Sequence, residues 1–218
     1  MLTLSDKEKS FLKRLDTPRK IQDFLDALPV NFELRGDTCM SPRRVLREGR
    51  AHCMEGALLA AAALWINGKR PLLLDLKAAK EDDSHVVALF RVHGRWGAIS
   101  KTNHAVLRYR EPVYGTIREL ALSYFHEYFL NNGKKTLRSY AGPFDLRRFR
   151  RGAWVAAEDD LWDIVEAIDA APHLMIAPLA LLRTFRLADP IERAAGKITE
   201  WRSGGRPGGE KRNRFQGF

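Results

Sequence analysis

Cysteine is scarce in this sequence: only Cys39 and Cys53 occur among 218 residues. One possible pair cannot form the disulfide framework that holds small secreted domains together, and two thiols without further clustered ligands are too few for a structural zinc site. Glycine-rich loops that cradle phosphate are also lacking, because the paired glycines after residue 203 follow no predicted strand. We therefore expect reduced thiols, no metal and no cofactor.

Long apolar segments are missing as well. The longest apolar run spans residues 57–66, about half the length that a membrane-spanning helix needs. Residues 1–20 mix charged and apolar side chains and contain no apolar block before a small-residue cleavage site, so we expect no signal peptide. Together these absences predict a cytoplasmic protein that binds no membrane.

Acidic residues are outnumbered in this chain. It has 37 lysines and arginines against 27 aspartates and glutamates, which gives a formal net charge of +10. A basic balance favours anionic partners, including nucleic acid. The arginines are spread along the chain and do not gather in one recognition helix, so solvated basic faces are the favoured interpretation. Residues 203–218 are rich in glycine and arginine and predict a disordered basic tail that could also hold an anionic partner.

Hydrophobic residues make up 45% of the chain, which suffices for one domain with a packed core. Capping residues predict helices after Ser5, Thr17 and Ser41, and a further helix that runs from Thr116 to about Gly133. Residues 71–77, 85–92 and 96–100 predict strands, the last two joined by a tight turn. This order predicts an α+β fold with a helical lead-in over residues 1–40, a core over 41–135 and a helical extension over 136–202.

The residue with the strongest chemical signal is Cys53. It begins an apolar helix of small residues that is predicted to run to residue 66. A thiol at the N-terminus of a helix lies at the positive end of the helix dipole, which favours the thiolate and hence nucleophilic reactivity. The alternative is a core cysteine that acts only as a small apolar side chain.

His85 is a candidate partner for Cys53. It follows an acidic loop over residues 81–84 and begins a predicted strand. From the end of a strand, its imidazole could reach a thiol at a helix N-terminus and act as general base and then general acid. The alternative is a loop histidine that only hydrogen-bonds the acidic loop. His52 precedes Cys53 directly and could line the site.

Three segments together resemble a known family. They are residues 50–64 (RAHCMEGALLAAAAL), 84–90 (SHVVALF) and 94–99 (GRWGAI). A cysteine that opens a helix, a histidine that opens a strand, and a glycine–x–tryptophan turn at Trp96 resemble the core of the transglutaminase-like superfamily over about residues 41–105. The resemblance implies a papain-like α+β core and acyl-transfer chemistry through a thioester on Cys53.

The third catalytic position departs from this family. Its members usually carry an aspartate a few residues after the tryptophan, where it orients the histidine, but Ser100 occupies that place here. Asn103 is the other candidate, because asparagine orients the histidine in papain-like enzymes. For the oxyanion, the backbone N–H of Cys53 is the natural donor, and Asn31 is a candidate second donor or, alternatively, a loop or capping residue.

The sequence therefore predicts a cysteine enzyme of transglutaminase-like type that acts on an amide or ester bond of a protein or peptide substrate. Hydrolysis and acyl transfer both remain open. Two alternatives are a catalytically inactive binding or scaffold domain of the same fold, which the missing aspartate favours, and a basic nucleic-acid-associated protein, which the charge favours.

Overall fold

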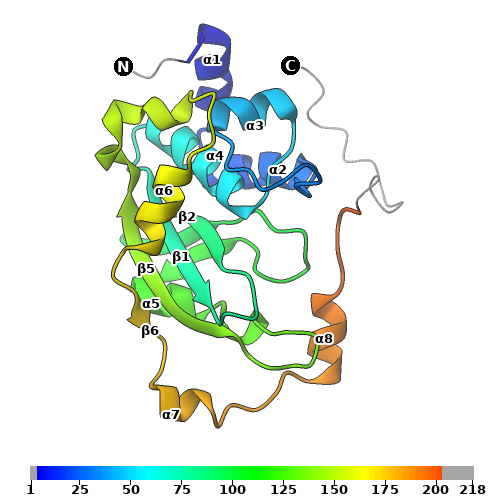
Figure 1. The fold of residues 1–218 in the computed structure, drawn as a ribbon. Coiled ribbons are helices and arrows are strands. Elements are labelled where there is room, and N and C mark those ends of the chain that lie inside the picture. The colour runs from blue at the N-terminus through cyan, green and yellow to red at the C-terminus, as the bar shows by residue number, and fades with distance from the viewer. Residues whose placement is uncertain (1–3, 203–218) are drawn as a thin grey trace.

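The computed structural model describes residues 4–202, apart from the side chains of residues 150 and 151. Within this range six strands form one antiparallel sheet in the order β4-β3-β2-β1-β5-β6 (Figure 1). The strands are β1 (Leu72–Ala78), β2 (His85–Val92), β3 (Arg95–Ile99), β4 (Arg110–Tyr114), β5 (Leu137–Asp145) and β6 (Leu174–Met175). The predicted α+β class is confirmed. The predicted tail over residues 203–218 lies outside the described residues.

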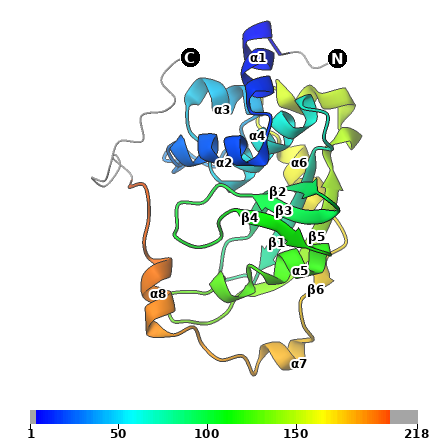
Figure 2. The same cartoon turned by 180° about the vertical axis from the view of Figure 1, so that it is seen from behind.

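Helices cover both faces of the sheet. They are α1 (Asp6–Arg14), α2 (Pro18–Ala27), α3 (Pro42–Glu48), α4 (Cys53–Ile66), α5 (Ile117–Leu122), α6 (Trp162–Asp169), α7 (Leu179–Leu182) and α8 (Pro190–Gly196). The helices α1 to α4 and α6 gather on one face, and α5 covers the other, as the view from behind shows (Figure 2). The predicted caps Ser5, Thr17, Ser41 and Thr116 all accept a backbone hydrogen bond at a helix start, which confirms these helix starts.

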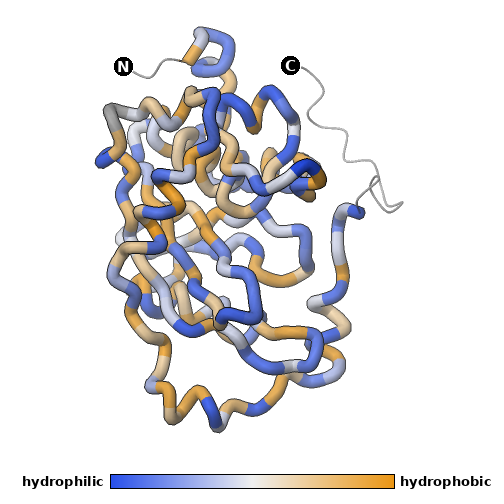
Figure 3. Tube along the Cα trace, in the orientation of Figure 1, coloured by the Kyte–Doolittle hydropathy of each residue, from blue (hydrophilic) through white to orange (hydrophobic). Residues whose placement is uncertain are grey.

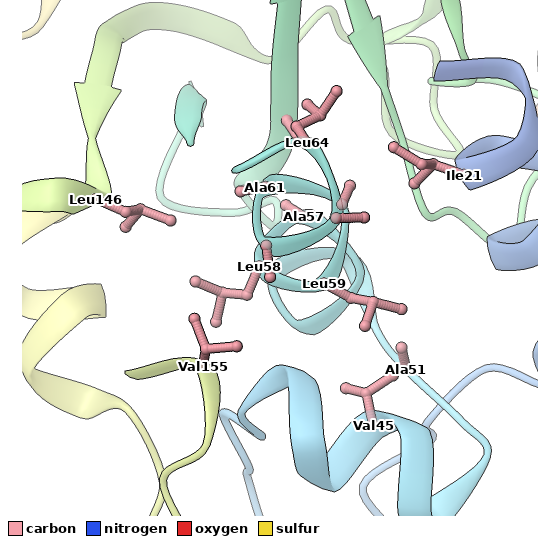
Figure 4. Close-up of a cluster of buried hydrophobic side chains, with 14 of the residues drawn as sticks. Ile21, Val45, Ala51, Ala57, Leu58, Leu59, Ala61, Leu64, Leu146 and Val155 are labelled. Atoms are coloured by element: carbon pink, nitrogen blue, oxygen red, sulfur yellow. The ribbon is translucent and has the colours of Figure 1, made fainter. Parts of the chain in front are cut away.

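The helix that carries Cys53 is the centre of the larger core. Residues 54–64 of α4 are all buried, so this helix is enclosed around its whole circumference, and all of these residues except Glu55 are uncharged. Leu58 points toward Val155 and Leu59 toward Val45, while alanines let neighbouring elements approach closely (Figure 4). Burial of this kind stabilises a leucine side chain by about 1.5–3 kcal/mol. The packing therefore holds the first turn of α4 in a fixed position beside β2.

Two predicted boundaries need correction. The extension over residues 136–202 is not purely helical, because β5 pairs along β1 and belongs to the same sheet as the core. The helix after Thr116 ends at Leu122, and a short 3-10 turn over Phe125–Glu127 replaces its predicted second half. In the second place, tertiary packing overrides the local helical pattern, and in the first, pairing with β1 adds residues 137–145 to the sheet.

Apolar surface is concentrated near the C-terminal end of the described chain. Leu179 and Leu181 of α7 are exposed, and Figure 3 shows hydrophobic colour along this segment outside the sheet. Among residues 4–202, no helix combines the length and the apolar character that a bilayer crossing requires.

Candidate active site

The site begins at the junction between α3 and α4. Helix α3 ends at Gly49, whose φ of +65° lies in the left-handed region, and the chain turns there toward α4. Cys53 is the first residue of α4 and is half-buried. Backbone N–H groups in the first turn of a helix have no partner within that helix, so the Cys53 N–H is available to an oxyanion.

A buried carboxylate fixes this helix start. Glu55 has no solvent exposure, and its oxygens accept from the side chains of Asn31 (3.2 Å) and Thr38 (2.8 Å). They also accept from the backbone N–H groups of Met40 (3.0 Å) and His52 (3.0 Å). The Asn31 amide is therefore bound to Glu55 and Thr38. The structure places Asn31 beneath the helix start as a support, and it is not among the described residues that line the cavity at Cys53.

The predicted histidine lies beside the predicted cysteine. His85 begins β2 and is buried, and its Nε2 lies 2.8 Å from the Oγ of Ser100. The Ser100 hydroxyl has one proton, which it donates to the Leu107 carbonyl at 2.5 Å. Ser100 must then accept from the Nε2–H of His85. Because Nε2–H is taken by Ser100, Nδ1 is the ring nitrogen that remains for the interaction between His85 and the Cys53 thiol.

The two histidines next to Cys53 change its acidity. Burial raises the pKa of the Cys53 thiol, but hydrogen bonds from His52 and His85 and the positive charges of both rings lower it to about 5. The balance favours the thiolate at neutral pH. A thiolate beside an imidazolium is the reactive state of a cysteine nucleophile.

His52 caps the helix and adds to this effect. In the neutral ring, Nδ1 accepts from the Met54 N–H at 3.2 Å, and Nε2–H donates to the Thr38 carbonyl at 2.9 Å. Burial lowers the pKa of His52, but the hydrogen bond and charge of Cys53 and the charge of Glu55 raise it above its usual range. His52 therefore caps α4 when neutral and supports the Cys53 thiolate when charged.

Ser100 is held in place by a helix far away in sequence. The buried side chain of Gln22 in α2 donates to the Ser100 carbonyl at 2.8 Å and accepts from the Ser100 N–H at 2.9 Å. The next residue, Lys101, is also buried and donates through Nζ to the carbonyls of Leu25 (2.9 Å) and Leu28 (2.5 Å) at the end of the same helix. Both contacts fix the backbone from which Ser100 reaches His85.

The nucleophile helix packs against this same segment. A Cβ atom placed on Gly56, three residues after Cys53, would lie 2.4 Å from the Cβ of Lys101. Only glycine permits so close an approach of α4 to the chain after β3. The helix that carries Cys53 and the residue that hydrogen-bonds His85 are therefore parts of one packed unit.

The other candidates lie elsewhere. The side-chain amide of Asn103 pairs with the backbone of Trp201, so the structure brings Ser100, and not Asn103, to His85. Trp96 lies at the opposite end of β3 from Ser100 and packs under the guanidinium of Arg91, 5.1 Å from its ring centre.

The sequence patterns do not assign Gln22, Glu55 and Lys101 to the site. Glu55 had a signal, because it is a charged residue within an otherwise uncharged apolar run, and Gln22 had a weaker one, because it lies on the apolar face of its helix. Lys101 gave no signal, since a lysine after a strand is usually exposed.

A cavity of about 370 Å³ opens over Cys53 and His85. Its lining includes Cys53, His85 and Tyr128, together with Arg193 of α8 and Lys197 just after that helix. Among residues 4–202, no cluster of three or more histidine, cysteine or acidic side chains has the geometry of a metal site. The cavity is large enough to admit a side chain and part of the main chain of a peptide.

Comparisons with known proteins give limited similarity. No protein-family model matches the chain, and no curated protein matches it in sequence. Similar solved structures include LapG from Legionella pneumophila after EGTA treatment. The two sequences are 18% identical, the match covers 44% of this chain and 57% of that chain, and the TM-score is 0.33. A second LapG structure has 17% identity, covers 44% and 59% of the two chains, and has a TM-score of 0.32. The matches thus span less than two thirds of LapG.

Proposed function

We propose that this protein is a cysteine enzyme of transglutaminase-like type that cleaves or transfers an acyl group through a thioester on Cys53. The observation that carries the proposal is the hydrogen-bonded chain from Ser100 through His85 to a thiol whose pKa is lowered to about 5. A core cysteine with no chemical role would not need two histidines beside it. Cys39, by contrast, is fully buried, and burial, followed by the charge of Glu55, raises its pKa to about 12.

In the proposed reaction, the Cys53 thiolate attacks the carbonyl carbon of an amide or ester, and the carbonyl oxygen becomes an oxyanion that accepts from the Cys53 N–H. The tetrahedral intermediate collapses when the bond to the leaving group breaks. His85 donates its Nδ1 proton to the departing amine or alcohol, which leaves an acyl thioester on Cys53. Water or an amine, deprotonated by His85, then attacks the thioester and releases the thiolate.

The orienting role in this proposal belongs to Ser100. A serine hydroxyl bears no charge, so it stabilises the imidazolium less than the aspartate of the family would. Its own proton is committed to Leu107, and its backbone is fixed by Gln22, so it presents an oxygen lone pair to Nε2–H in a fixed direction. Rigid placement can thus replace part of the missing charge.

An activated ester tests the proposed chemistry without knowledge of the natural substrate. We expect p-nitrophenyl acetate to acetylate Cys53 and to release p-nitrophenol at least about a hundredfold faster than with Cys53→Ala, in line with acid–base assistance of a thiolate nucleophile. Mass spectrometry of peptides would locate the acetyl group, and Cys39 serves as the internal control. Acetylation spread over lysines, at a rate that Cys53→Ala leaves unchanged, would favour an inactive binding domain of the same fold.

The fate of the acyl group would separate the two possible outcomes. After acetylation, a primary amine such as glycine methyl ester is added, and the products are identified. Formation of the N-acetyl amine faster than acetate would indicate acyl transfer, and acetate alone would indicate hydrolysis.

A further inference from the structure

The segment after α8, residues 197–201, lies beside the loop that follows β3; we name it the C-terminal strap. The Ala105 N–H donates to the Ile198 carbonyl at 3.0 Å, and the Glu200 N–H donates to the Asn103 carbonyl at 2.9 Å. His104 and Thr199 face each other as an antiparallel bridge between these two bonds. Figures 1 and 2 both place the chain after α8 beside this loop. The strap therefore pairs with residues 103–105 as a short strand would.

The side chain of Asn103 extends this pairing by one residue. Its Nδ2 donates to the Trp201 carbonyl at 3.0 Å, and its Oδ1 accepts from the Trp201 N–H at 2.8 Å. One side-chain amide thus satisfies both backbone groups of a single residue. Such a contact recognises an extended main chain and does not depend on which side chain that residue bears.

The side chains of the strap differ in exposure. Ile198 is 62% exposed, and Lys197 is exposed as well. Glu200 pairs with Arg108 at 3.3 Å, and both side chains are partly exposed, so solvent screens this ion pair. Four hydrogen bonds hold main-chain groups of the strap, two of them to the main chain of residues 103–105 and two to the side-chain amide of Asn103. Proteins that bind extended peptides at a free strand edge use the same mode of contact.

This edge adjoins the candidate active site. His104 lies in the paired loop, Lys197 is the first residue of the strap, and Gly196 precedes it; all three line the cavity that contains Cys53 and His85. An extended peptide on residues 103–105 would enter the cavity with its main chain held. We propose that residues 103–105 and the side-chain amide of Asn103 form a binding edge for an extended peptide main chain, and that the strap occupies this edge as an internal ligand. The proposed function is needed only to identify the bound peptide as a substrate; the binding edge itself does not depend on it.

Two variants at one position separate the main-chain contact from the side-chain contact. Glu200→Pro removes both the side chain of Glu200 and the N–H that donates to Asn103, whereas Glu200→Ala removes the side chain and keeps that N–H. Both are made with Cys53→Ala, so that binding is measured without any reaction. The probe is a fluorescein-labelled peptide with the sequence of residues 196–202 (GKITEWR). Its binding to each protein is measured by fluorescence anisotropy.

We expect the Glu200→Pro protein to bind this peptide at least about tenfold more tightly than the Glu200→Ala protein, because its strap competes for the edge with one main-chain hydrogen bond fewer. A peptide N-methylated at its glutamate should lose binding, since it lacks the same N–H. Equal affinity of the two variants, or unchanged binding of the N-methylated peptide, would overturn the proposal. Failure of the ester assay with normal peptide binding would instead contradict the proposed function alone.

Hydrogen exchange on the unaltered protein gives a second test, which does not depend on whether a variant folds. Excess peptide should displace the strap, so the amides of Glu200 and Trp201 should exchange at least about fivefold faster while Ala105 stays protected by the incoming peptide. Unchanged exchange at Glu200 and Trp201 under saturating peptide would contradict a shared edge.

Discussion

His85→Ala should move the apparent pKa of Cys53 from about 5 toward the value near 8.5 of a free cysteine. The substitution removes one hydrogen bond and one positive charge from the thiolate, while His52 remains. At pH 5 the thiolate fraction would fall several hundredfold, but a more basic thiolate is also a better nucleophile, which offsets part of the loss. We therefore expect alkylation by iodoacetamide at pH 5 to slow by about thirtyfold.

Two further variants make this result specific. Ser100→Ala should give a smaller change in the same direction, about threefold to tenfold, because it removes the hydrogen bond that orients His85 and leaves the ring in place. His126→Ala is the control, since His126 is exposed and lies in the turn after α5. An alkylation profile of His85→Ala that matches the unaltered protein would show that His85 does not interact with the thiol.

Glu55→Ala should reduce the free energy of unfolding by about 3–5 kcal/mol. Its carboxylate is fully buried and accepts hydrogen bonds from four groups, including the backbone N–H groups of Met40 and His52. Without it, these donors stay buried with no acceptor, and each such group costs about 1–3 kcal/mol. The loss is a large fraction of the stability of an ordinary domain, so partial unfolding at 37 °C is a realistic outcome.

Urea unfolding followed by tryptophan fluorescence would measure this loss. Glu48→Ala is the matched control, because Glu48 lies near the surface at the end of α3 and its ion pairs with Arg47 and Arg50 are 3.6 and 3.8 Å long. We expect Glu48→Ala to change stability by less than about 0.5 kcal/mol. If Glu55→Ala lost no more than Glu48→Ala, the carboxylate would not be the anchor of the α4 start.

The positions of Cys53 and His85 could be predicted because each depends on local signals. A glycine ends the preceding helix, an apolar run defines α4, and β-branched and aromatic residues define β2. The choice between Ser100 and Asn103 could not be made in this way. It depends on the path of the chain after β3, which is set by contacts with Gln22, 78 residues earlier, and with Trp201, 98 residues later.

The strand β5 shows the same limit for the fold. Gly142 and Pro143 interrupt its sequence, and both residue types are depleted in strands. Pairing with β1 nevertheless forms, with a register shift between Leu73 and Asp75 that accommodates the irregularity. The membership of β5 in the sheet is therefore a consequence of long-range pairing, which local sequence patterns do not encode.

The pH dependence of Cys53 alkylation in the unaltered protein tests the central claim most directly. Because the pKa of Cys53 is lowered to about 5, the thiolate predominates above that pH and is protonated below it. The rate should stay nearly constant from pH 6 to pH 8 and fall below about pH 5, while buried Cys39 stays unlabelled. An alkylation rate that rises tenfold per pH unit through neutrality and levels off only near pH 9 would show an ordinary thiol. That result would contradict the proposed pair of Cys53 and His85.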